Sequence, residues 1–137
     1  MQRHVLWLRI VLAVLAGIIL LFTLPAYANP ASNPGLAKLT GEAATLGSVA
    51  GLFLGRQLAL ALIAVYGAVN GSTQPMLIGA AALAFFNLHD AILLSLFGAA
   101  GPGAIAGLVI GLAAIGVAAT VYRRALRSWA EVKETAR

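Results

Sequence analysis

Polar and charged side chains interrupt two long apolar stretches of the chain. Asn87, His89 and Asp90 lie within the run PMLIGAAALAFFNLHDAILLSLFG, which is otherwise almost wholly apolar, and Arg56 and Gln57 interrupt an earlier run. A charged side chain at the centre of a bilayer costs about 2.5–3.5 kcal/mol on insertion scales, so Arg56 and Asp90 need a compensating interaction. An arginine–carboxylate ion pair supplies one, because the guanidinium donates hydrogen bonds that the carboxylate accepts.

The spacing of these two charges predicts that they pair across a helical hairpin. The segment NGSTQP between the two apolar runs is typical of a tight turn, so the flanking helices are expected to be antiparallel neighbours. Arg56 precedes the middle of this turn by about 17 positions and Asp90 follows it by about 17, which at about 1.5 Å per residue places both about 25 Å from the turn. We therefore expect an Arg56–Asp90 ion pair.

Neighbouring polar residues extend this pair into a cluster. The same register places Gln57 opposite His89, while Asn87 shares a helix face with Asp90 at i,i+3 spacing. Imidazole ordinarily changes charge between about pH 5 and 8, so His89 is the residue best suited to carry a proton. The cluster is either a satisfied network that fixes helix register or the lining of a pocket or proton path. We favour the pocket, because ionisable groups inside membranes usually mark functional sites.

Glu42 marks an expected external entrance to this cluster. It precedes Arg56 by about 14 residues, which is close to four helical turns, so both would lie on nearly the same face of one helix. Thr40 is a suitable N-cap for that helix. A polar route would then run from Glu42 at the outer surface down to the ion pair.

Composition and the lengths of the apolar runs predict an all-α integral membrane protein. Of the 137 residues, 61% are hydrophobic and only 9% are charged, against about 25% charged in soluble domains. Crossing the hydrocarbon core takes about 20 helical residues. We expect an up-and-down four-helix bundle that forms a single transmembrane domain over residues 1–137. The expected spans are residues 5–24, 43–69, 76–98 and 103–122, followed by a helical cytoplasmic tail at 123–137.

The distribution of lysine and arginine predicts the orientation. Basic residues gather near the two chain ends, whereas the first loop has only Lys38 and the other two loops have none. An even number of spans puts both termini on one side, and the positive-inside rule makes that side the cytoplasm. The alternative is a signal peptide over residues 1–28, because PAYA, with Ala26 and Ala28, is a good cleavage pattern. We favour retention, since the apolar run extends upstream of Arg9.

Small residues recur at every fourth position in two of the expected helices, a pattern typical of helix packing in membranes. The second helix carries Ala43, Gly47, Gly51, Gly55 and Ala59, and the fourth carries Gly103, Gly107 and Gly111. These ridges are expected mainly to pack the helices of the bundle against one another. A ridge left over would favour a homo-oligomer or docking into a larger membrane complex.

Several chemistries lack the residues that they require. The chain has no cysteine, and His89 has no metal-ligating partner at its depth, so we assign neither a metal site nor a catalytic residue. The period-four glycines lack the strand that a phosphate-binding GxGxxG loop requires. Basic residues at the chain ends without interleaved aromatic residues do not indicate nucleic-acid binding. An enzyme is therefore less favoured than a binding protein.

With its polar positions placed, the chain resembles the small four-helix bacterial membrane proteins of the DoxX-like group, most of which are uncharacterised. The resembling residues are Arg9, Gly17, Phe22 and Pro25 in the first helix, the stretch LFLGRQLALAL at 52–62, and Asp90 within LHDA. The resemblance covers most of the chain through loose motifs and implies a bundle in the bacterial inner membrane. Some members are associated with quinone-linked sulfur oxidation, which implies that a quinone could bind near Arg56, His89 and Asp90.

Three functions follow from these expectations. The leading one is a binding protein whose arginine–aspartate–histidine cluster holds a small lipophilic or proton-linked ligand. The second is a non-catalytic accessory subunit that packs into a larger membrane complex, and the third is a quinone-linked redox subunit. Co-purification with partners in mild detergent would distinguish the accessory subunit from the binding protein.

Overall fold

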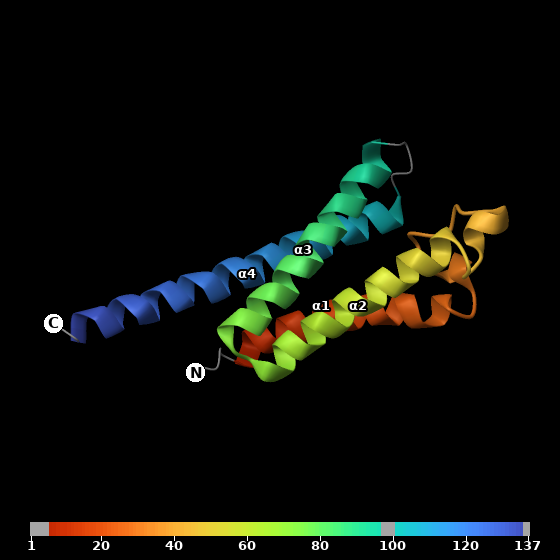
Figure 1. Ribbon diagram of the computed structural model, residues 1–137. Helices are drawn as coiled ribbons and strands as arrows, with labels where there is room; N and C mark the ends of the chain where they lie inside the picture. The colour runs from red at the N-terminus through yellow and green to blue at the C-terminus, as the bar shows by residue number, and fades with distance from the viewer. Residues whose placement is uncertain (1–5, 97–100, 136–137) are drawn as a thin grey trace.

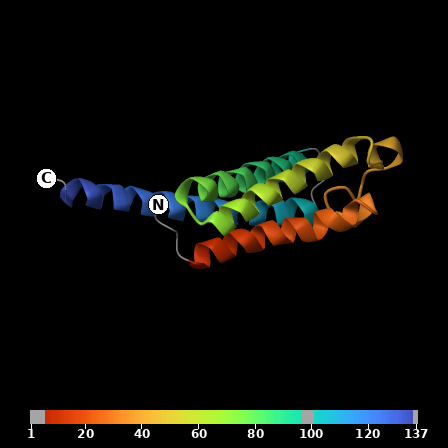
Figure 2. The same cartoon turned by 60° about the horizontal axis from the view of Figure 1, so that its bottom comes forward.

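Long helices make up most of the computed structural model, which describes residues 6–96 and 101–135 (Figure 1). They are α1 (Leu6–Ala26), α2 (Val49–Asn70), α3 (Thr73–Leu96) and α4 (Pro102–Thr135), with the short 3-10 helices η1 (Pro30–Ser32) and η2 (Gly41–Ala44) between α1 and α2. Consecutive helices run in opposite directions and lie side by side (Figure 2). The predicted all-α, up-and-down four-helix bundle is confirmed.

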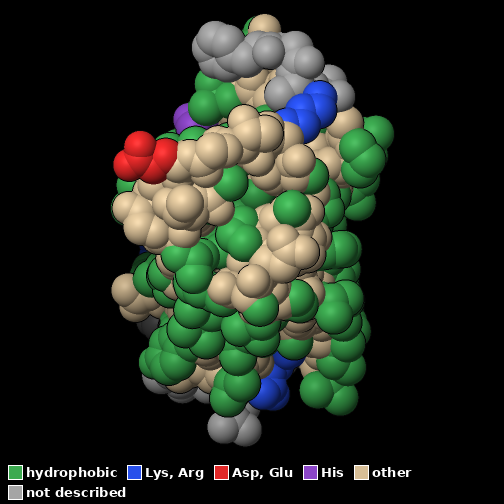
Figure 3. Space-filling model, turned by 90° about the vertical axis from the view of Figure 1, so that its right-hand side faces the viewer, with side chains coloured by type: hydrophobic (Ala, Val, Ile, Leu, Met, Phe, Trp, Pro, Cys, Tyr) green, Lys and Arg blue, Asp and Glu red, His purple; other side chains and the backbone are tan. Residues whose placement is uncertain are grey.

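All four helices are long and apolar enough to cross a membrane. Leu21, Leu52, Phe85 and Leu112, one from each helix, are all more than half exposed. Hydrocarbon accepts such side chains on the sides of a bundle, and helices satisfy their own backbone hydrogen bonds there. Figure 3 shows the loop end, where hydrophobic side chains lie among backbone and polar atoms and charged groups are few. The chain is therefore a membrane protein.

Helix α2 begins later than expected, at Val49 rather than at residue 43. Residues Gly41–Ala44 form the separate helix η2, and the extended backbone of Thr45 (φ −83°, ψ 153°) ends it. Thr40 precedes η2 instead of α2, and its side chain makes no capping hydrogen bond. Glycine and threonine disfavour helix, so this segment forms a separate 3-10 turn at the loop end of the candidate span Gly41–Asn70.

The other helix boundaries lie close to the expected ones. α1 continues through Pro25 to Ala26, and α4 runs for 34 residues, so the expected helical tail continues the fourth span without a break. Figure 1 shows this tail projecting beyond the other helices, with the start of α1 and the end of α4 on the same side of the bundle. Val5, residues 97–98 and residues 136–137 of the expected elements lie outside the described residues.

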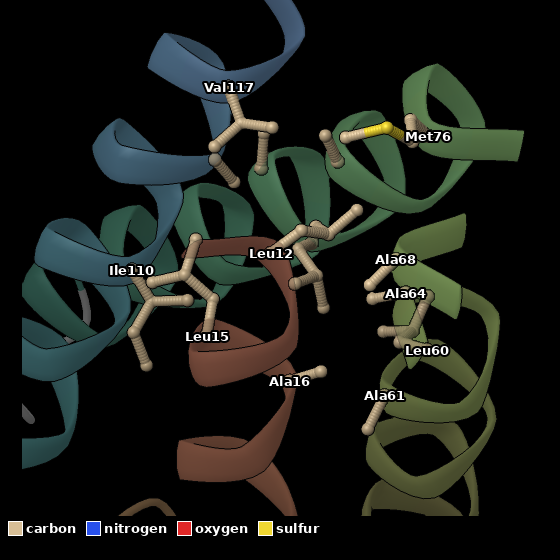
Figure 4. Packing of buried hydrophobic residues seen from close by; sticks show 14 of the residues in the cluster. Leu12, Leu15, Ala16, Leu60, Ala61, Ala64, Ala68, Met76, Ile110 and Val117 are labelled. Atoms are coloured by element: carbon tan, nitrogen blue, oxygen red, sulfur yellow. The ribbon is translucent and has the colours of Figure 1, made fainter. Parts of the chain in front are cut away.

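The hydrophobic core runs along the bundle axis and takes residues from every helix (Figure 4). Leu12 and Leu15 of α1 lie at its centre beside Ile110 and Val117 of α4. Alanine dominates the contribution of α2, which includes the almost fully buried residues Ala61, Ala64 and Ala68. Small side chains let this backbone approach its neighbours closely, which favours van der Waals packing where no hydrophobic effect drives helix association.

The two small-residue ridges behave differently. On α4, a Cβ built on Gly107 would lie 2.9 Å from the Asn87 carbonyl oxygen, and one built on Gly111 would lie 2.6 Å from Leu88 Cγ, so this ridge packs against α3. Gly103 packs against the backbone of Pro34 in the loop. These three glycines therefore allow contacts that a larger residue would block.

The expectation that the ridge of the second helix packs the bundle is wrong. Ala43 and Gly47 precede α2, and the close neighbour of Gly51 is the backbone of Leu46 in the preceding turn. A Cβ on Gly55 would meet no described atom within 4 Å, and Ala59 is exposed. Close packing of α2 against α3 instead uses Gly67, whose Cβ would lie 2.6 Å from the Pro75 carbonyl oxygen, and Gly79, whose Cβ would lie 2.9 Å from Ala64 Cα.

Arg9 ties α1 to the end of α2. Its Nε donates to the Ala68 carbonyl oxygen at 2.7 Å, and its Nη2 donates to the Val69 carbonyl oxygen at 2.8 Å. The last carbonyls of a helix have no partner within the helix, and a cation is favoured near that end of the dipole. Gly71 closes α2 in the left-handed conformation (φ 70°) directly against the Arg9 side chain.

Arg9→Leu is expected to lower the free energy of unfolding by about 1–2 kcal/mol, because two charge-assisted hydrogen bonds to α2 are lost. Arg123→Leu, at an exposed position of α4, is the control and should change stability by less than about 0.5 kcal/mol. Unfolding in mixed detergent micelles, followed by far-UV circular dichroism, measures both. Equal losses of stability in Arg9→Leu and Arg123→Leu would mean that Arg9 acts only through its charge.

Candidate functional site

The ion pair between α2 and α3 is present, as the sequence spacing predicts. Arg56 Nη2 donates to Asp90 Oδ2 at 2.6 Å, and the two side chains are 35% and 20% exposed. The rings of Phe53 and Phe86 lie 5.3 and 5.4 Å from the guanidinium carbon, so aromatic faces flank the charge. Arg56 Nε is buried and has no hydrogen-bond partner in the described structure. Asp90 is therefore the main compensation for this charge.

His89 lies on the outer side of the pair. Its Nδ1 is 3.3 Å from Asp90 Oδ1, its side chain is 47% exposed, and its ring stacks on Phe85 at a centroid distance of 6.0 Å. Among the described residues Gln57 makes no hydrogen bond, so it is not bonded to His89, the residue that the sequence register places opposite it. The imidazole thus lies beside a carboxylate that itself borders the interior of the bundle.

Asp90 borders a cavity of about 290 Å³ that lies between the four helices and the first loop. Most of its lining is apolar, and Gly103, Ala106 and Gly107 of α4 leave the space that larger side chains would fill. The loop closes one end with Asn33, whose Nδ2 donates to the Phe22 carbonyl oxygen at 3.3 Å and whose Oδ1 accepts from Gly35 N at 2.9 Å. The cavity is therefore built by residues from distant parts of the chain.

Several polar side chains that line this cavity have atoms with no hydrogen-bond partner among the described residues. Asn87 Nδ2 donates to the Leu83 carbonyl oxygen at 2.8 Å within α3, and none of the hydrogen bonds of the described residues uses its Oδ1. Thr23 is 1% exposed, and its buried hydroxyl has no partner in the described structure. Gln57 is likewise without a partner there. An unpaired polar group in such surroundings costs free energy unless something occupies the cavity and bonds to it.

The proposed entrance at Glu42 is wrong in its geometry. Glu42 belongs to η2 and not to α2, so it does not share a helix face with Arg56, and it does not line the cavity. It is exposed at the loop end of the molecule. The break at Thr45 separates it from the helix that carries the ion pair, and the polar route through Glu42 is lost with it.

Thr23 and Asn33 belong to the cavity although sequence reasoning did not single them out. A threonine in an apolar helix normally bonds the carbonyl of the preceding turn, so its type and position gave no signal. Asn33 lies in a loop where asparagine is common for turn formation alone. Their roles depend on how the loop packs onto α1, which Leu36 fixes by packing with Ala26 and Leu54.

The donors and acceptors of the cavity limit what it can hold. In the described residues no group of three histidine, aspartate or glutamate side chains is arranged to bind a metal ion. A quinone head would need donors for its carbonyl oxygens, and the Gln57 amide is a lining group that can supply them, while the Asp90 carboxylate only accepts.

No family model matches the chain, and no similar curated protein or solved structure was found. The function is therefore argued from the geometry of the cavity and of the ion pair beside it.

Proposed function

We propose that this membrane protein binds a small lipophilic or proton-linked ligand in the cavity beside Arg56 and Asp90. The observation that carries the proposal is the largely apolar cavity between the four helices, which the Asp90 carboxylate and the Gln57 amide, unpartnered among the described residues, border. Asn87 adds a further free polar atom to the same space. A mostly apolar pocket with a few convergent polar groups is the usual form of a small-molecule site.

The contact between His89 and Asp90 supports the proton-linked form of this proposal. His89 is exposed on the outer side of α3, while Asp90 borders the cavity, so a proton on the imidazole alters the charge next to the ligand site. Arg56 holds the same carboxylate from the other side. Binding would then change with the protonation of His89.

We also propose that the protein belongs to the DoxX-like group and lies in a bacterial inner membrane with both termini in the cytoplasm. Exposed arginines on the projecting part of α4, Arg123, Arg124 and Arg127, support this orientation. The packing of Arg9 against α2 gives one of the residues of the resemblance a structural role. A quinone is the ligand that membership of this group would suggest.

A non-catalytic accessory subunit is the second proposal, and the outward face of α2 favours it. Gly55 and Ala59 leave a shallow strip that none of the described helices covers. Small residues on a lipid-facing strip allow a helix of another protein, or of a second copy, to pack closely.

The first test fills the cavity. Leu94 lines it and the neighbouring Leu93 does not, so Leu94→Trp removes the ligand space while Leu93→Trp adds the same bulk on the outer side of α3. Native mass spectrometry of protein purified in mild detergent is expected to show a retained small molecule in the wild type and in Leu93→Trp, and to lose it in Leu94→Trp. Equal retention by all three contradicts the proposal, and a co-purifying protein in its place indicates the accessory subunit.

A further inference from the structure

The exposed part of the cavity lining is apolar. Phe22 of α1, Pro34 of the loop, and Pro102 and Ala106 of α4 are the lining residues that are also exposed, and all four are apolar. They lie on both sides of the gap between α1 and α4, two helices that contact each other much less than consecutive helices do. Figure 1 shows the α3–α4 pair diverging from the α1–α2 pair towards the loop end. The cavity therefore opens sideways, between α1 and α4.

The inner end of the cavity is polar but carries little net charge. Asp90 is already paired with Arg56, and Arg56 itself does not line the cavity. An anionic head would meet the carboxylate without a cation, and a cationic head would compete with the guanidinium. A hydroxyl can donate to Asp90 or to Asn87 Oδ1 and accept from the Gln57 amide, so it uses the free polar atoms without adding a charge.

The volume sets the size of the occupant. Pockets that enclose a whole drug-sized ligand measure about 300–1,000 Å³, and this one, at about 290 Å³, lies just below that range. It holds a small head group and the first carbons of a chain. The rest of a longer chain would leave through the apolar mouth into the bilayer, where its burial costs nothing.

We infer that the ligand is a neutral single-chain amphiphile with a hydroxyl head, which enters from the lipid leaflet on the loop side through the gap between α1 and α4. This inference rests on the proposed function, because it names the class of ligand for the same cavity. Its two parts, the hydroxyl head and the lateral entry, follow from separate observations and can fail separately.

The test uses the full-length protein in lipid vesicles and a photoactivatable long-chain alcohol, hexadecanol with a diazirine in its chain near the hydroxyl. Cross-linked residues are mapped by peptide mass spectrometry, and labelling is expected at residues that line the cavity. Unlabelled hexadecanol should compete, and hexadecyl methyl ether, which has no hydroxyl donor, should compete about tenfold less well. Palmitate and hexadecylamine test whether a charged head is accepted.

Two variants test the hydroxyl head of the ligand and its entry between α1 and α4 separately. Gln57→Leu removes the amide donor from the cavity wall and is expected to weaken labelling about five- to tenfold, without loss of stability, because the amide makes no hydrogen bond among the described residues. Ala106→Trp narrows the mouth and is expected to reduce labelling about tenfold. Ala119→Trp, at an exposed position of the same helix away from the cavity, is the matched control and should label like the wild type.

Each outcome decides one part of the inference. If the methyl ether or either charged amphiphile competes as well as hexadecanol, the hydroxyl head is overturned while the cavity remains a binding site. Labelling in Ala106→Trp equal to that in Ala119→Trp overturns entry between α1 and α4. If the alcohol labels no lining residue while Leu94→Trp still abolishes retention of a native ligand, the ligand class is wrong and the proposed function stands. If Leu94→Trp has no effect either, both are wrong.

Discussion

Asp90→Ala is expected to lower the free energy of unfolding by about 2–4 kcal/mol, because it leaves the Arg56 guanidinium without a counter-charge inside the membrane. Arg56 Nε has no partner in the described structure, and the remaining compensation comes from the rings of Phe53 and Phe86. The loss is bounded because Arg56 lies about two turns after the start of α2, so its long side chain can extend towards the interface. Unfolding in mixed detergent micelles measures the change.

A double substitution separates the ion pair from the individual side chains. Arg56→Leu combined with Asp90→Leu removes both charges and is expected to recover at least half of the loss, because no unpaired charge remains. Glu42→Ala, at an exposed position in η2, serves as a control for removing a carboxylate and should be nearly neutral. If the double variant is as unstable as Asp90→Ala, the pair does not offset the cost of its own charges.

The ion pair was predictable because its position depends on few quantities. The turn residues fixed the middle of the hairpin, and the constant rise of a helix then set equal depths for Arg56 and Asp90. α2 ends at Asn70 and α3 begins at Thr73, so no extra turn shifts the register. Hydrophobic run length and composition gave the four helices for similarly general reasons, since any chain in a bilayer must satisfy its backbone internally.

The cavity was not predictable in the same way. Its lining depends on how α1 and α4 are oriented about their axes and on the path of a loop of more than twenty residues. Neither follows from apolar periodicity, because these helices are hydrophobic on most sides. Thr23 and Asn33 reach the site only through that packing. The prediction of an entrance at Glu42 was wrong for a related reason: the apolar composition continues into the loop, but the helix α2 does not.

Small-residue spacing was a reliable signal on α4 and a misleading one on α2. The pattern at Gly103, Gly107 and Gly111 coincides with backbone contacts to the loop and to α3. On α2 the same spacing faces away from the bundle at Gly55, while the close contact occurs at Gly67, outside the repeat. A small-xxx-small pattern states that close approach is sterically allowed; which neighbour uses it depends on tertiary packing.

Gly67→Ala and Gly55→Ala are expected to change stability in opposite directions although both place the same methyl group on α2. A Cβ at Gly67 would lie 2.6 Å from the Pro75 carbonyl oxygen and 3.3 Å from Met76 Cα, atoms of the α3 backbone that cannot move without shifting the helix. We expect Gly67→Ala to lower the free energy of unfolding by about 2–3 kcal/mol. At Gly55 the space is open, so alanine should raise it by about 0.5–1 kcal/mol through its better helix propensity.

Measuring the stability of Gly67→Ala and Gly55→Ala in lipid vesicles as well as in detergent adds a test of the outward face of α2. If Gly55→Ala stabilises the purified chain but weakens its association with another membrane protein in the native membrane, the strip at Gly55 and Ala59 is a docking surface, because a methyl group there prevents close approach of a partner helix. If Gly55→Ala is harmless in both settings, lipid covers this face. A loss of stability at Gly55 equal to that at Gly67 would contradict the packing of α2 against α3 described here.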